Sequence, residues 1–332
     1  MKPEGGALLP IAASYLAARD LLSSKAVLVD VGCSGGHVDT FKPLKDNLTV
    51  YAYDPLVAEV ERLARQAPPG THYRAAFVGP GPDAPRKPAS DVPSNAIQSR
   101  TYAAEMNART RFDNVKEVFN RGDKVVHADR AVSLDADLEG VEVDYLKVDT
   151  DGHDYGVLLG AQGILSRRRI SAVMVECRMH GRQSDDANLW RNIDRLLCES
   201  GLSLFDFRPR RYSRAALPSP FTNSSGRAGA TRSGQINWAD AVYLRDLGAP
   251  DYEQTWGQSY DADTILKTVA AMDQLGFPDA AIEVLETYRE RLAGRLDVDH
   301  FINVICKTAT GRLYPEHLRQ MGLWPPREAR TA

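Results

Sequence analysis

Side chains able to take part in proton transfer gather where one apolar run of residues ends. The sequence DYLKVDTDGHDYGVLLGA (residues 144–161) brings Asp149, Asp151, His153 and Asp154 into a single expected turn. An imidazole exchanges its proton near neutral pH, and a base beside an alcohol helps its oxygen to attack. We therefore predict His153 as a candidate general base, with Asp149 and Asp151 either orienting it or hydrogen bonding to substrate hydroxyls. Asp154 is alternatively a cap of the helix that follows.

The same acids allow a second chemistry, which is metal binding. Asp149, Asp151 and Asp154 follow one expected strand and Glu176 ends the next, so all of them belong to one edge of a sheet. Oxygen ligands suit magnesium or calcium, and a bound ion would acidify a hydroxyl group. We keep a divalent metal as an alternative that the sequence does not favour.

Polar residues at the end of that next strand are candidate substrate contacts. The segment VECRMHGR places Glu176, Arg178 and His180 at the same edge of the sheet. His180 is also a rival of His153 for the role of base. The competing interpretation is a polar surface loop without a role in the reaction.

A glycine turn follows the first expected strand, in the segment VDVGCSGGH. Glycine permits a sharp turn and a close approach of a ligand to the main chain. The spacing is neither the GxGxxG of dinucleotide-binding proteins nor the GK[ST] of a phosphate-binding loop. A nicotinamide enzyme and a P-loop enzyme are therefore disfavoured.

Two acids beside this turn indicate which ligand it binds. Asp54 ends the second expected strand, where a carboxylate can accept hydrogen bonds from both ribose hydroxyls. Asp30 precedes the turn and attracts a sulfonium while it repels a pyrophosphate. Together they favour S-adenosylmethionine over a dinucleotide, and Cys33 is expected to offer its backbone N–H rather than a nucleophilic thiol. The candidate cofactor-binding residues are Asp30, Gly32, Cys33, Ser34, Gly35, Asp54, Pro55 and Ala76.

The elements that must position these residues alternate between strands and helices. Apolar, β-branched runs predict strands at residues 26–32, 49–55, 72–79, 143–149, 170–177, 202–208 and 239–246. Helical spacing between them predicts helices at residues 57–67, 155–165 and 189–201. This order predicts an α/β fold with a doubly wound, mostly parallel, Rossmann-like sheet and helices on both faces. In such a sheet the ligand site lies at the carboxyl ends of the strands.

Composition excludes several classes of function. The chain has 332 residues, a formal net charge of -3 and 4 scattered cysteines without a CxxC pair. We therefore expect no nucleic-acid partner and reduced thiols in the cytoplasm. Arg19 and Asp20 interrupt the first apolar stretch, and no other segment is long enough to span a membrane.

The chain resembles the FkbM type of class I methyltransferases. The matching motifs are VDVGCSGG, YDP, RAAFVG, VSLDADL, VDYLKVDTDGHDYGVLLGA and AVMVEC, over about residues 27–177, with a weaker echo in WADAVYLRD. The resemblance implies O-methylation, often of sugars or polyketide-type natural products, with S-adenosylmethionine as the donor. Where family members read D-x-E-G-x-E, this sequence has Asp151 and Asp154 with His153 between them.

Three regions are expected along the chain. Residues 1–25 form an N-terminal helix packed on the core, residues 26–250 the S-adenosylmethionine-binding methyltransferase domain, and residues 251–332 a helical C-terminal region. Within the last region, helical patterns at residues 265–276, 280–294 and 301–311 each close at a glycine. This helical tail also makes a homo-oligomer possible.

Two stretches do not follow the alternation of strands and helices. Residues 79–96 are rich in proline and predict an irregular insertion. Residues 208–235 predict a long basic loop, either a solvated loop or a lid over a phosphorylated or nucleotide-linked sugar. Its arginines are Arg208, Arg210, Arg211, Arg214, Arg227 and Arg232.

The function predicted from the sequence is S-adenosylmethionine-dependent O-methylation of a hydroxyl on a sugar, glycan or glycosylated metabolite. Its partner would be a small-molecule or glycan acceptor. The alternatives are an O-methyltransferase of a non-sugar natural product and a non-catalytic donor-binding or scaffold module.

Overall fold

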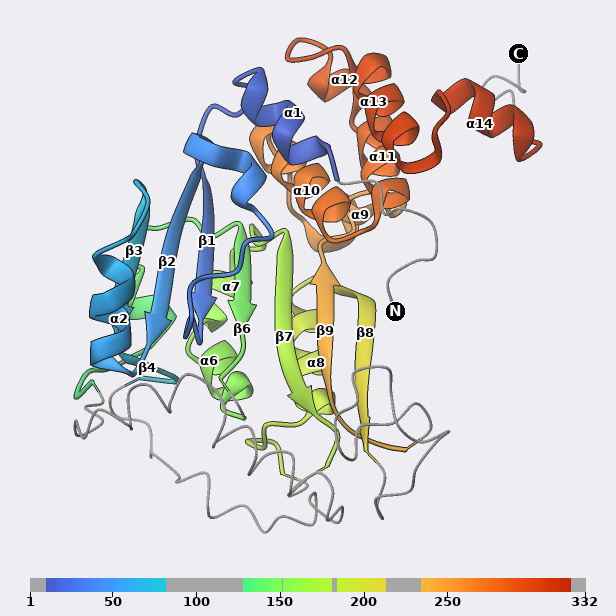
Figure 1. Cartoon of the computed structure of the whole chain (residues 1–332). Coiled ribbons are helices and arrows are strands. Elements are labelled where there is room, and N and C mark those ends of the chain that lie inside the picture. Colours follow the sequence, from blue (N-terminus) through green and yellow to red (C-terminus); the bar gives the residue numbers. More distant parts are fainter. Residues whose placement is uncertain (1–9, 82–127, 151, 181–183, 213–233, 324–332) are drawn as a thin grey trace. The chain divides into compact units, whose positions relative to one another are not determined.

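A seven-stranded sheet organises the larger part of the molecule (Figure 1). The structure is a computed structural model that describes residues 10–81, 128–150, 152–180, 184–212 and 234–323. The strand order is β3-β2-β1-β6-β7-β9-β8, so the chain starts in the middle of the sheet and builds outward in both directions. The strands are β1 (Ala26–Val31), β2 (Leu48–Asp54), β3 (Thr71–Ala75), β6 (Tyr145–Val148), β7 (Ala172–Arg178), β8 (Ser203–Tyr212) and β9 (Gln235–Leu244).

The central strands run parallel to one another. Val31 of β1 pairs with Val148 of β6, and Val148 pairs in turn with Val175 of β7. At the other side, β2 pairs with β3 in the same sense. The arrow of β9 points opposite to that of β7 in Figure 1. The expectation of a doubly wound, mostly parallel, Rossmann-like sheet is confirmed.

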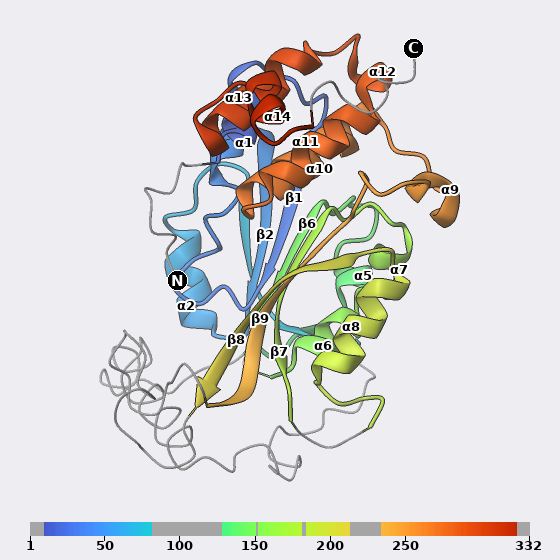
Figure 2. The ribbon, with the colours of Figure 1, turned by 90° about the vertical axis from the view of Figure 1, so that its right-hand side faces the viewer.

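Helices cover both faces of this sheet, as the view in Figure 2 shows. Helix α2 (Val57–Ala64) lies on one face. Helices α6 (Asp154–Leu159), α7 (Gln162–Ser166) and α8 (Trp190–Glu199) lie on the other, with the short α5 (Leu134–Asp137). Apolar side chains such as Leu146, Val173 and Ile193 are fully or almost fully buried between these layers. Burial on both faces explains why the central strands read as continuous apolar runs.

The third expected strand is divided into two. β3 ends at Ala75, and after Ala76 the chain leaves the main sheet as β4 (Phe77–Val78). β4 pairs in parallel with β5 (Ala131–Val132) in a separate two-stranded sheet. The apolar run alone does not reveal this division, because either sheet can bury it.

The expected basic loop begins later than the sequence predicts. β8 continues to Tyr212, so Arg208, Arg210 and Arg211 lie on a strand. Arg210 forms an ion pair with Asp240 of β9 at 2.7 Å, and Arg211 donates to the carbonyl of Gly234. β8 is the edge strand, where Pro209 needs no partner for its missing N–H. The loop arginines Arg214, Arg227 and Arg232, with most of the expected insertion at 79–96, lie outside the described residues.

A second compact unit combines the two ends of the described chain. It contains the described residues up to Val27, the segment Asp39–Thr49 and the described residues from Leu244 onward. Its elements are α1 (Ala12–Ala18), η1 (Lys42–Asn47), α9 (Tyr252–Trp256), α10 (Ala262–Gln274), α11 (Pro278–Thr287), α12 (Arg289–Leu292), α13 (Val298–Thr310) and α14 (Tyr314–Gln320). The helical C-terminal region is therefore present, and the three domain boundaries expected from the sequence stay predictions. None of the helices in the described ranges is long and apolar enough to cross a bilayer.

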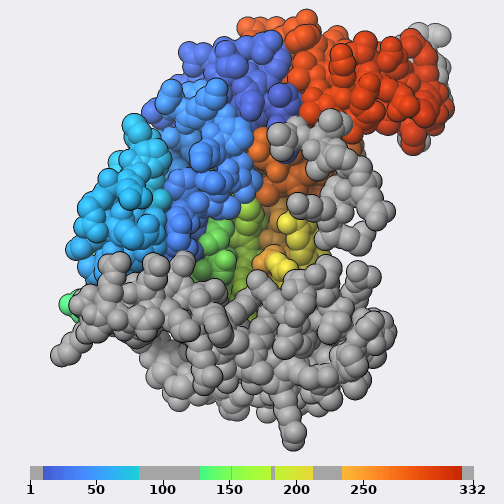
Figure 3. All heavy atoms as spheres, viewed as in Figure 1, coloured from blue at the N-terminus to red at the C-terminus, as the bar shows by residue number. Residues whose placement is uncertain are grey.

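Helix α1 packs against the C-terminal helices of this unit. Figure 3 shows the dark blue surface of α1 beside the orange surface of the C-terminal helices. The carboxylate of Asp273 in α10 accepts hydrogen bonds from the N–H groups of Ile11 and Ala12, both at 2.7 Å. The ring of Tyr15 stacks on that of Phe301, with 4.4 Å between the centroids. A carboxylate from α10 thus satisfies the open N–H groups at the start of α1.

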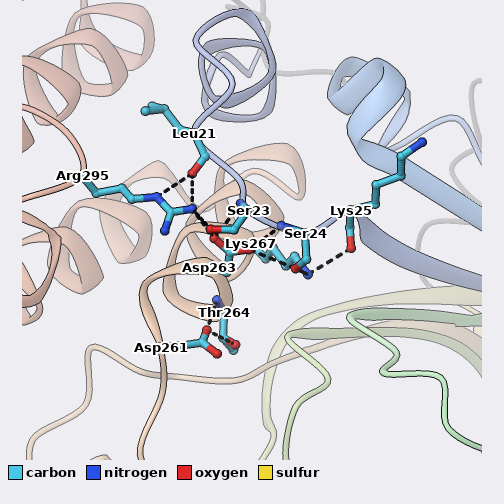
Figure 4. A network of polar contacts seen from close by, with 9 residues as sticks. All are labelled: Leu21, Ser23, Ser24, Lys25, Asp261, Asp263, Thr264, Lys267 and Arg295. Carbon is cyan, nitrogen blue, oxygen red and sulfur yellow. Dashed lines mark hydrogen bonds and ion pairs between the residues drawn. The ribbon is translucent and has the colours of Figure 1, made fainter.

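A polar network fastens the segment after α1 to the same helices (Figure 4). Asp263 accepts hydrogen bonds from the N–H groups of Ser23 and Ser24 at 3.0 and 2.8 Å. Arg295 pairs with Asp263 at 2.6 Å and also donates to the carbonyl of Leu21. Lys267 donates to the carbonyl of Lys25 at 3.1 Å.

Candidate active site

Two turns at the carboxyl ends of β1 and β6 touch each other through their backbones. We call residues 32–36 the glycine turn and residues 149–154 the acidic turn. Gly32 has φ +86, and a Cβ there would overlap the carbonyl oxygen of Asp149. The N–H of Asp149 donates to the carbonyl of Val31 at 3.0 Å. Only glycine combines this backbone conformation with so close an approach.

The N–H groups of the glycine turn are used within the protein. Those of Gly32 and Cys33 both donate to the carbonyl of Tyr53, at 2.9 and 3.1 Å. The N–H of Cys33 is therefore not the open donor that the sequence suggested, because β2 runs directly beside the turn. The N–H of Gly35 donates to the Glu59 carboxylate of α2 at 2.9 Å. Burial raises the pKa of the Cys33 thiol and so disfavours its thiolate form.

Asp30 lies fully buried beneath the glycine turn. Its Oδ2 accepts a hydrogen bond from the N–H of Val38 at 2.7 Å, and its Oδ1 lies 3.2 Å from the ammonium of Lys147. Burial raises the pKa of Asp30, and the Lys147 charge opposes that shift. Asp30 thus binds the segment that follows the glycine turn to β1 and forms an ion pair with Lys147.

Asp54 and its neighbours lie next to the glycine turn, at the end of β2. The Oδ1 of Asp54 accepts a hydrogen bond from the N–H of Leu56 at 2.8 Å. Burial raises the pKa of Asp54, and hydrogen bonds from the backbone N–H groups of Leu56 and Ser34 oppose this shift. Ala76 is buried and donates its N–H to the carbonyl of Asp54, while the carbonyl of Pro55 accepts from the N–H of Ala128.

Lys147 and Glu59, which were not predicted from the sequence, also belong to this side of the site. Lys147 of β6 donates to the carbonyl of Gly32 at 2.9 Å and lies 3.6 Å from Asp149. Glu59 binds Gly35 and also Arg62, whose hydrogen bond is the main reason that the pKa of Glu59 is lowered. The sequence does contain a sign of Lys147, because a charged residue is unusual inside an otherwise apolar strand and Lys147 stands two positions before Asp149.

His153 is the N-cap residue of α6 and is exposed. Its imidazole lies against two glycines: a Cβ on Gly156 would lie 2.6 Å from its Cε1, and one on Gly79 would lie 3.0 Å from its Nε2. The ring thus occupies space that any larger residue at those positions would fill. Asp149 is also exposed, whereas Asp151 lies outside the described residues.

The carboxylate of Asp154 is bound within the acidic turn. It is fully buried, and its carboxylate reaches back across the turn to the N–H of Thr150 at 2.8 Å and to the amide of Asn188 at 3.1 Å. Burial raises its pKa, and these hydrogen bonds counter the shift. The side chain therefore closes the acidic turn, and its carboxylate also accepts a hydrogen bond from the backbone N–H of Asp154 at the start of α6.

The candidate substrate residues at the end of β7 and just after it face different partners. The guanidinium of Arg178 lies over Gly152, where a Cβ would overlap it, so Arg178 belongs to the acidic turn. Glu176 is half-buried within β7. The Nε2 of His180 lies 2.8 Å from the carbonyl of Ile236, an acceptor that requires a proton on that nitrogen. His180 is thus turned toward β9.

Two of the candidate metal ligands that the structure describes are engaged with other residues. Asp149 lies beside Lys147, and Asp154 is occupied by Thr150 and Asn188. Within the described ranges, no group of three or more His, Cys, Asp or Glu residues is placed to hold a metal ion.

Comparison with known proteins finds a family model that is similar to the central part of the chain. Residues 50–204 match the family model of the methyltransferase FkbM domain. The match starts after the glycine turn and ends within β8. A search of curated proteins finds no significant match.

Solved structures with weak similarity to the chain include several methyltransferases. Methyltransferase FkbM from Methylobacillus flagellatus KT has 14% identity and a TM-score of 0.33, over 71% of this chain and 48% of its own. This chain thus spans about half the length of that protein. A SAM-dependent methyltransferase from Aquifex aeolicus has 12% identity and a TM-score of 0.29, over 73% of this chain and 95% of its own.

A putative tRNA (m1A22) methyltransferase from Streptococcus pneumoniae, in complex with S-adenosyl-L-methionine, has 12% identity and a TM-score of 0.30, over 82% of this chain and 97% of its own. The match over residues 50–204 confirms the family resemblance seen in the motifs. Residues 50–204 are therefore similar to the methyltransferase FkbM domain.

Proposed function

We propose that this chain is an S-adenosylmethionine-dependent O-methyltransferase that acts on a hydroxyl of a sugar, glycan or glycosylated metabolite. The observation that carries the proposal is the backbone contact between Gly32 and Asp149 at the carboxyl ends of β1 and β6. β1 has β2 on one side and β6 on the other, so the strand order reverses there. Ligands of doubly wound sheets bind at such a reversal. Residues of the two turns can therefore hold a donor and an acceptor side by side.

The residues of the glycine turn fit S-adenosylmethionine better than a nucleotide pyrophosphate. Asp30, Asp54 and Glu59 place three carboxylates around the turn, and N–H groups of Gly32, Cys33 and Gly35 already have protein acceptors. A pyrophosphate would meet negative charge and few open N–H groups. A ligand with ribose hydroxyls and a cationic sulfonium suits these acids. When bound, S-adenosylmethionine supplies the methyl group, and the electron pair of the broken sulfur–carbon bond stays on the sulfur.

The acidic turn supplies groups that can hold an alcohol and accept its proton. In our proposal Asp149 hydrogen bonds to the acceptor hydroxyl, and His153 takes the proton as the oxygen forms its new bond to carbon. Arg178, held over Gly152, binds a polar part of the acceptor. Positioning the hydroxyl supplies much of the rate, because it makes the reaction effectively intramolecular.

The alternatives from the sequence differ in acceptor or in activity. A non-sugar natural product with a hydroxyl would use the same turns. A non-catalytic donor-binding module would use only the glycine turn. We further propose a cytoplasmic location, supported by four cysteines that are all free in the structure: Cys33, Cys177, Cys198 and Cys306.

Donor binding tests the enzyme proposals first. Titration calorimetry of the full chain should show binding of both S-adenosylmethionine and S-adenosylhomocysteine. Asp54→Ala should weaken both at least about tenfold, because a ribose-binding carboxylate is lost. Absence of heat with either ligand on the wild-type chain would reject the proposed function.

An acceptor screen then identifies the reaction. Donor consumption measured against nucleotide sugars, free sugars and lipid-linked glycans should reveal the acceptor, with a polyphenol set as the non-sugar comparison. With that acceptor, His153→Ala should lower turnover about a hundredfold, within the range of general-base catalysis. Unchanged turnover would remove His153 from the mechanism.

Removal of metal separates the two chemistries of the acidic turn. Because Asp149 and Asp154 are engaged with Lys147, Thr150 and Asn188, we expect a chelator to leave turnover unchanged. Loss of activity in chelator that magnesium restores would instead support the metal-dependent alternative.

A further inference from the structure

The ammonium of Lys147 lies where the glycine turn and the acidic turn meet. Its Nζ donates to the carbonyl of Gly32 at 2.9 Å, and it lies 3.2 Å from Oδ1 of Asp30 and 3.6 Å from Oδ2 of Asp149. The contact with Gly32 is a hydrogen bond, and the contacts with the two carboxylates are ion pairs. Two of these three oxygens belong to β1 and its turn, and the third belongs to the end of β6.

The parallel register of the sheet enforces this arrangement. Asp30 of β1 is the register partner of Lys147 on β6. Residues two positions apart on a strand point to the same face. Gly32 and Asp149 follow two positions after Asp30 and Lys147, and the Lys147 ammonium contacts Asp30, the Gly32 carbonyl and Asp149.

The charge on Lys147 is fixed. Its side chain is 17% exposed and that of Asp30 1%, whereas that of Asp149 is 50% exposed. Burial lowers the pKa of Lys147, but the carboxylates of Asp30 and Asp149 outweigh that effect and the net shift is upward. This upward shift of the pKa keeps the ammonium charged at neutral pH.

We propose that Lys147 is a positioning residue that holds the Gly32 carbonyl and the Asp149 carboxylate at a fixed separation. Oδ2 of Asp149 faces the ammonium, and Oδ1 has no hydrogen bond or ion pair to another residue in the described part of the chain. That second oxygen is left for the acceptor. The inference rests on the proposed function and names the residue that couples its donor side to its acceptor side.

Donor affinity gives the first test. Lys147→Met keeps the length of the side chain but removes the cation from the Gly32 carbonyl and from buried Asp30. Titration calorimetry with S-adenosylhomocysteine should show at least a tenfold loss of affinity. An affinity within twofold of the wild-type value would overturn the proposal.

The chain offers a matched control in a second buried lysine. Lys267 is 6% exposed and donates to Oγ of Ser24 at 3.2 Å and to the carbonyl of Lys25 at 3.1 Å, within the other compact unit. Lys267→Met should lower the thermal midpoint while its affinity for S-adenosylhomocysteine stays within twofold. An equal loss of affinity in this control would show a general effect of lost stability and overturn the proposal.

A double-mutant cycle on turnover tests the coupling to Asp149. With the acceptor found in the screen, Lys147→Met should lower turnover at least tenfold when Asp149 is present. In the Asp149→Asn background the same substitution should lower turnover less than twofold. The loss of donor affinity should persist in both backgrounds. Losses of turnover that multiply independently would show that Lys147 does not act through Asp149.

A second variant covers the case in which Lys147→Met does not fold. Lys147→Arg keeps a cation beside Asp30, but a planar guanidinium cannot direct its donors to the same three oxygens. We expect its affinity for S-adenosylhomocysteine to fall at least fivefold, and an unchanged affinity would overturn the proposal. A wild-type chain that does not bind S-adenosylhomocysteine would reject the proposed function itself, whereas wild-type binding with unaffected variants rejects only the role of Lys147.

Discussion

Glycines leave the space in which the side chains of His153 and Arg178 lie. The His153 imidazole occupies space beside Gly156 and Gly79, and the Arg178 guanidinium occupies space over Gly152. Gly152 has φ +117, which an L side chain rarely adopts, but Gly156 lies inside α6. At Gly156 the glycine therefore serves the packing of the imidazole rather than the backbone.

Gly156→Ala should move the His153 ring without harming the fold. Its Cβ would lie 2.6 Å from Cε1 of His153, so the ring must turn away. We expect turnover to fall about tenfold because the proton acceptor is displaced. The free energy of unfolding should change by less than about 1 kcal/mol, because alanine favours a helix over glycine by roughly that amount. Steady-state methylation and urea unfolding measure the two effects.

A glycine with open surroundings provides the control for this variant. A Cβ on Gly294 would meet no atom within 4 Å, so Gly294→Ala should leave turnover unchanged. Combining Gly156→Ala with His153→Ala should add no loss beyond that of His153→Ala. A further loss would mean that Gly156 acts on the reaction by another route.

At the scale of elements, the site depends on how closely β1 approaches β6. The two strands are joined by register pairs up to Val31 and Val148, and beyond them Gly32 touches the carbonyl of Asp149. β2 contributes the carbonyl of Tyr53, which holds the N–H groups of Gly32 and Cys33. Three strands thus fix the glycine turn before any ligand is bound.

Gly32→Ala should separate the two turns. The new methyl group would overlap the carbonyl of Asp149 in a backbone conformation that already disfavours alanine. We expect the free energy of unfolding to fall by about 3 kcal/mol and donor binding to be lost. Urea unfolding and calorimetry with S-adenosylhomocysteine measure these changes.

Gly140→Ala separates backbone strain from the clash. Gly140 has φ +76, close to the φ +86 of Gly32, but a Cβ there would meet nothing within 4 Å. This variant should lose only about 1 kcal/mol and keep its donor affinity. Equal losses in the two variants would attribute the effect to strain alone and not to the contact between the turns.

At the scale of the whole molecule, the chain forms two compact units whose sequences interleave. In one of them, residues near the start of the described chain are fastened by acids from α10 that lie far away in sequence. Asp273 binds the N–H groups of Ile11 and Ala12, and Asp263 binds those of Ser23 and Ser24. Each carboxylate accepts backbone N–H groups that have no partner in a helix or strand.

Asp263 should make the stability of this unit depend on pH. Burial acts to raise its pKa, but hydrogen bonds from Ser23 and Ser24 and the charge of Arg295 outweigh it, so the pKa is lowered from 3.8. A lowered pKa means that folding favours the carboxylate. Its contribution is therefore fully present above about pH 4 and is lost as the pH falls through the folded-state pKa.

Asp263→Asn should weaken this unit by about 2 kcal/mol at pH 7, because hydrogen bonds to a charged group are lost. Hydrogen exchange should speed up at Ser23 and Ser24, and the decline of stability below pH 4 in urea unfolding should become shallower. Asp299→Asn is the control: Asp299 is 77% exposed in its pair with Arg289, and such pairs contribute little. An unchanged acid profile in Asp263→Asn would contradict this account.

The sequence alone determined the fold class and the location of the candidate site. Strands buried on both faces need continuous apolar runs, so these strands could be recognised without their neighbours. Their alternation with helices led to the parallel sheet, and a parallel sheet collects the carboxyl ends of its strands at one edge. Asp30, Gly32 and Asp149 were therefore expected near one another, and they lie there.

The tertiary structure alone decided which partner each of these groups has. The sequence does not show that Lys147 faces Asp30, that Glu59 takes the N–H of Gly35, or that Asp154 closes its own turn. The same holds for the N–H of Cys33, which is used by β2. These pairings depend on register across the sheet and on how helices cover it, whereas an apolar pattern records only which residues are buried. A charge at a strand end is thus visible in the sequence, but its neighbour across the sheet is not.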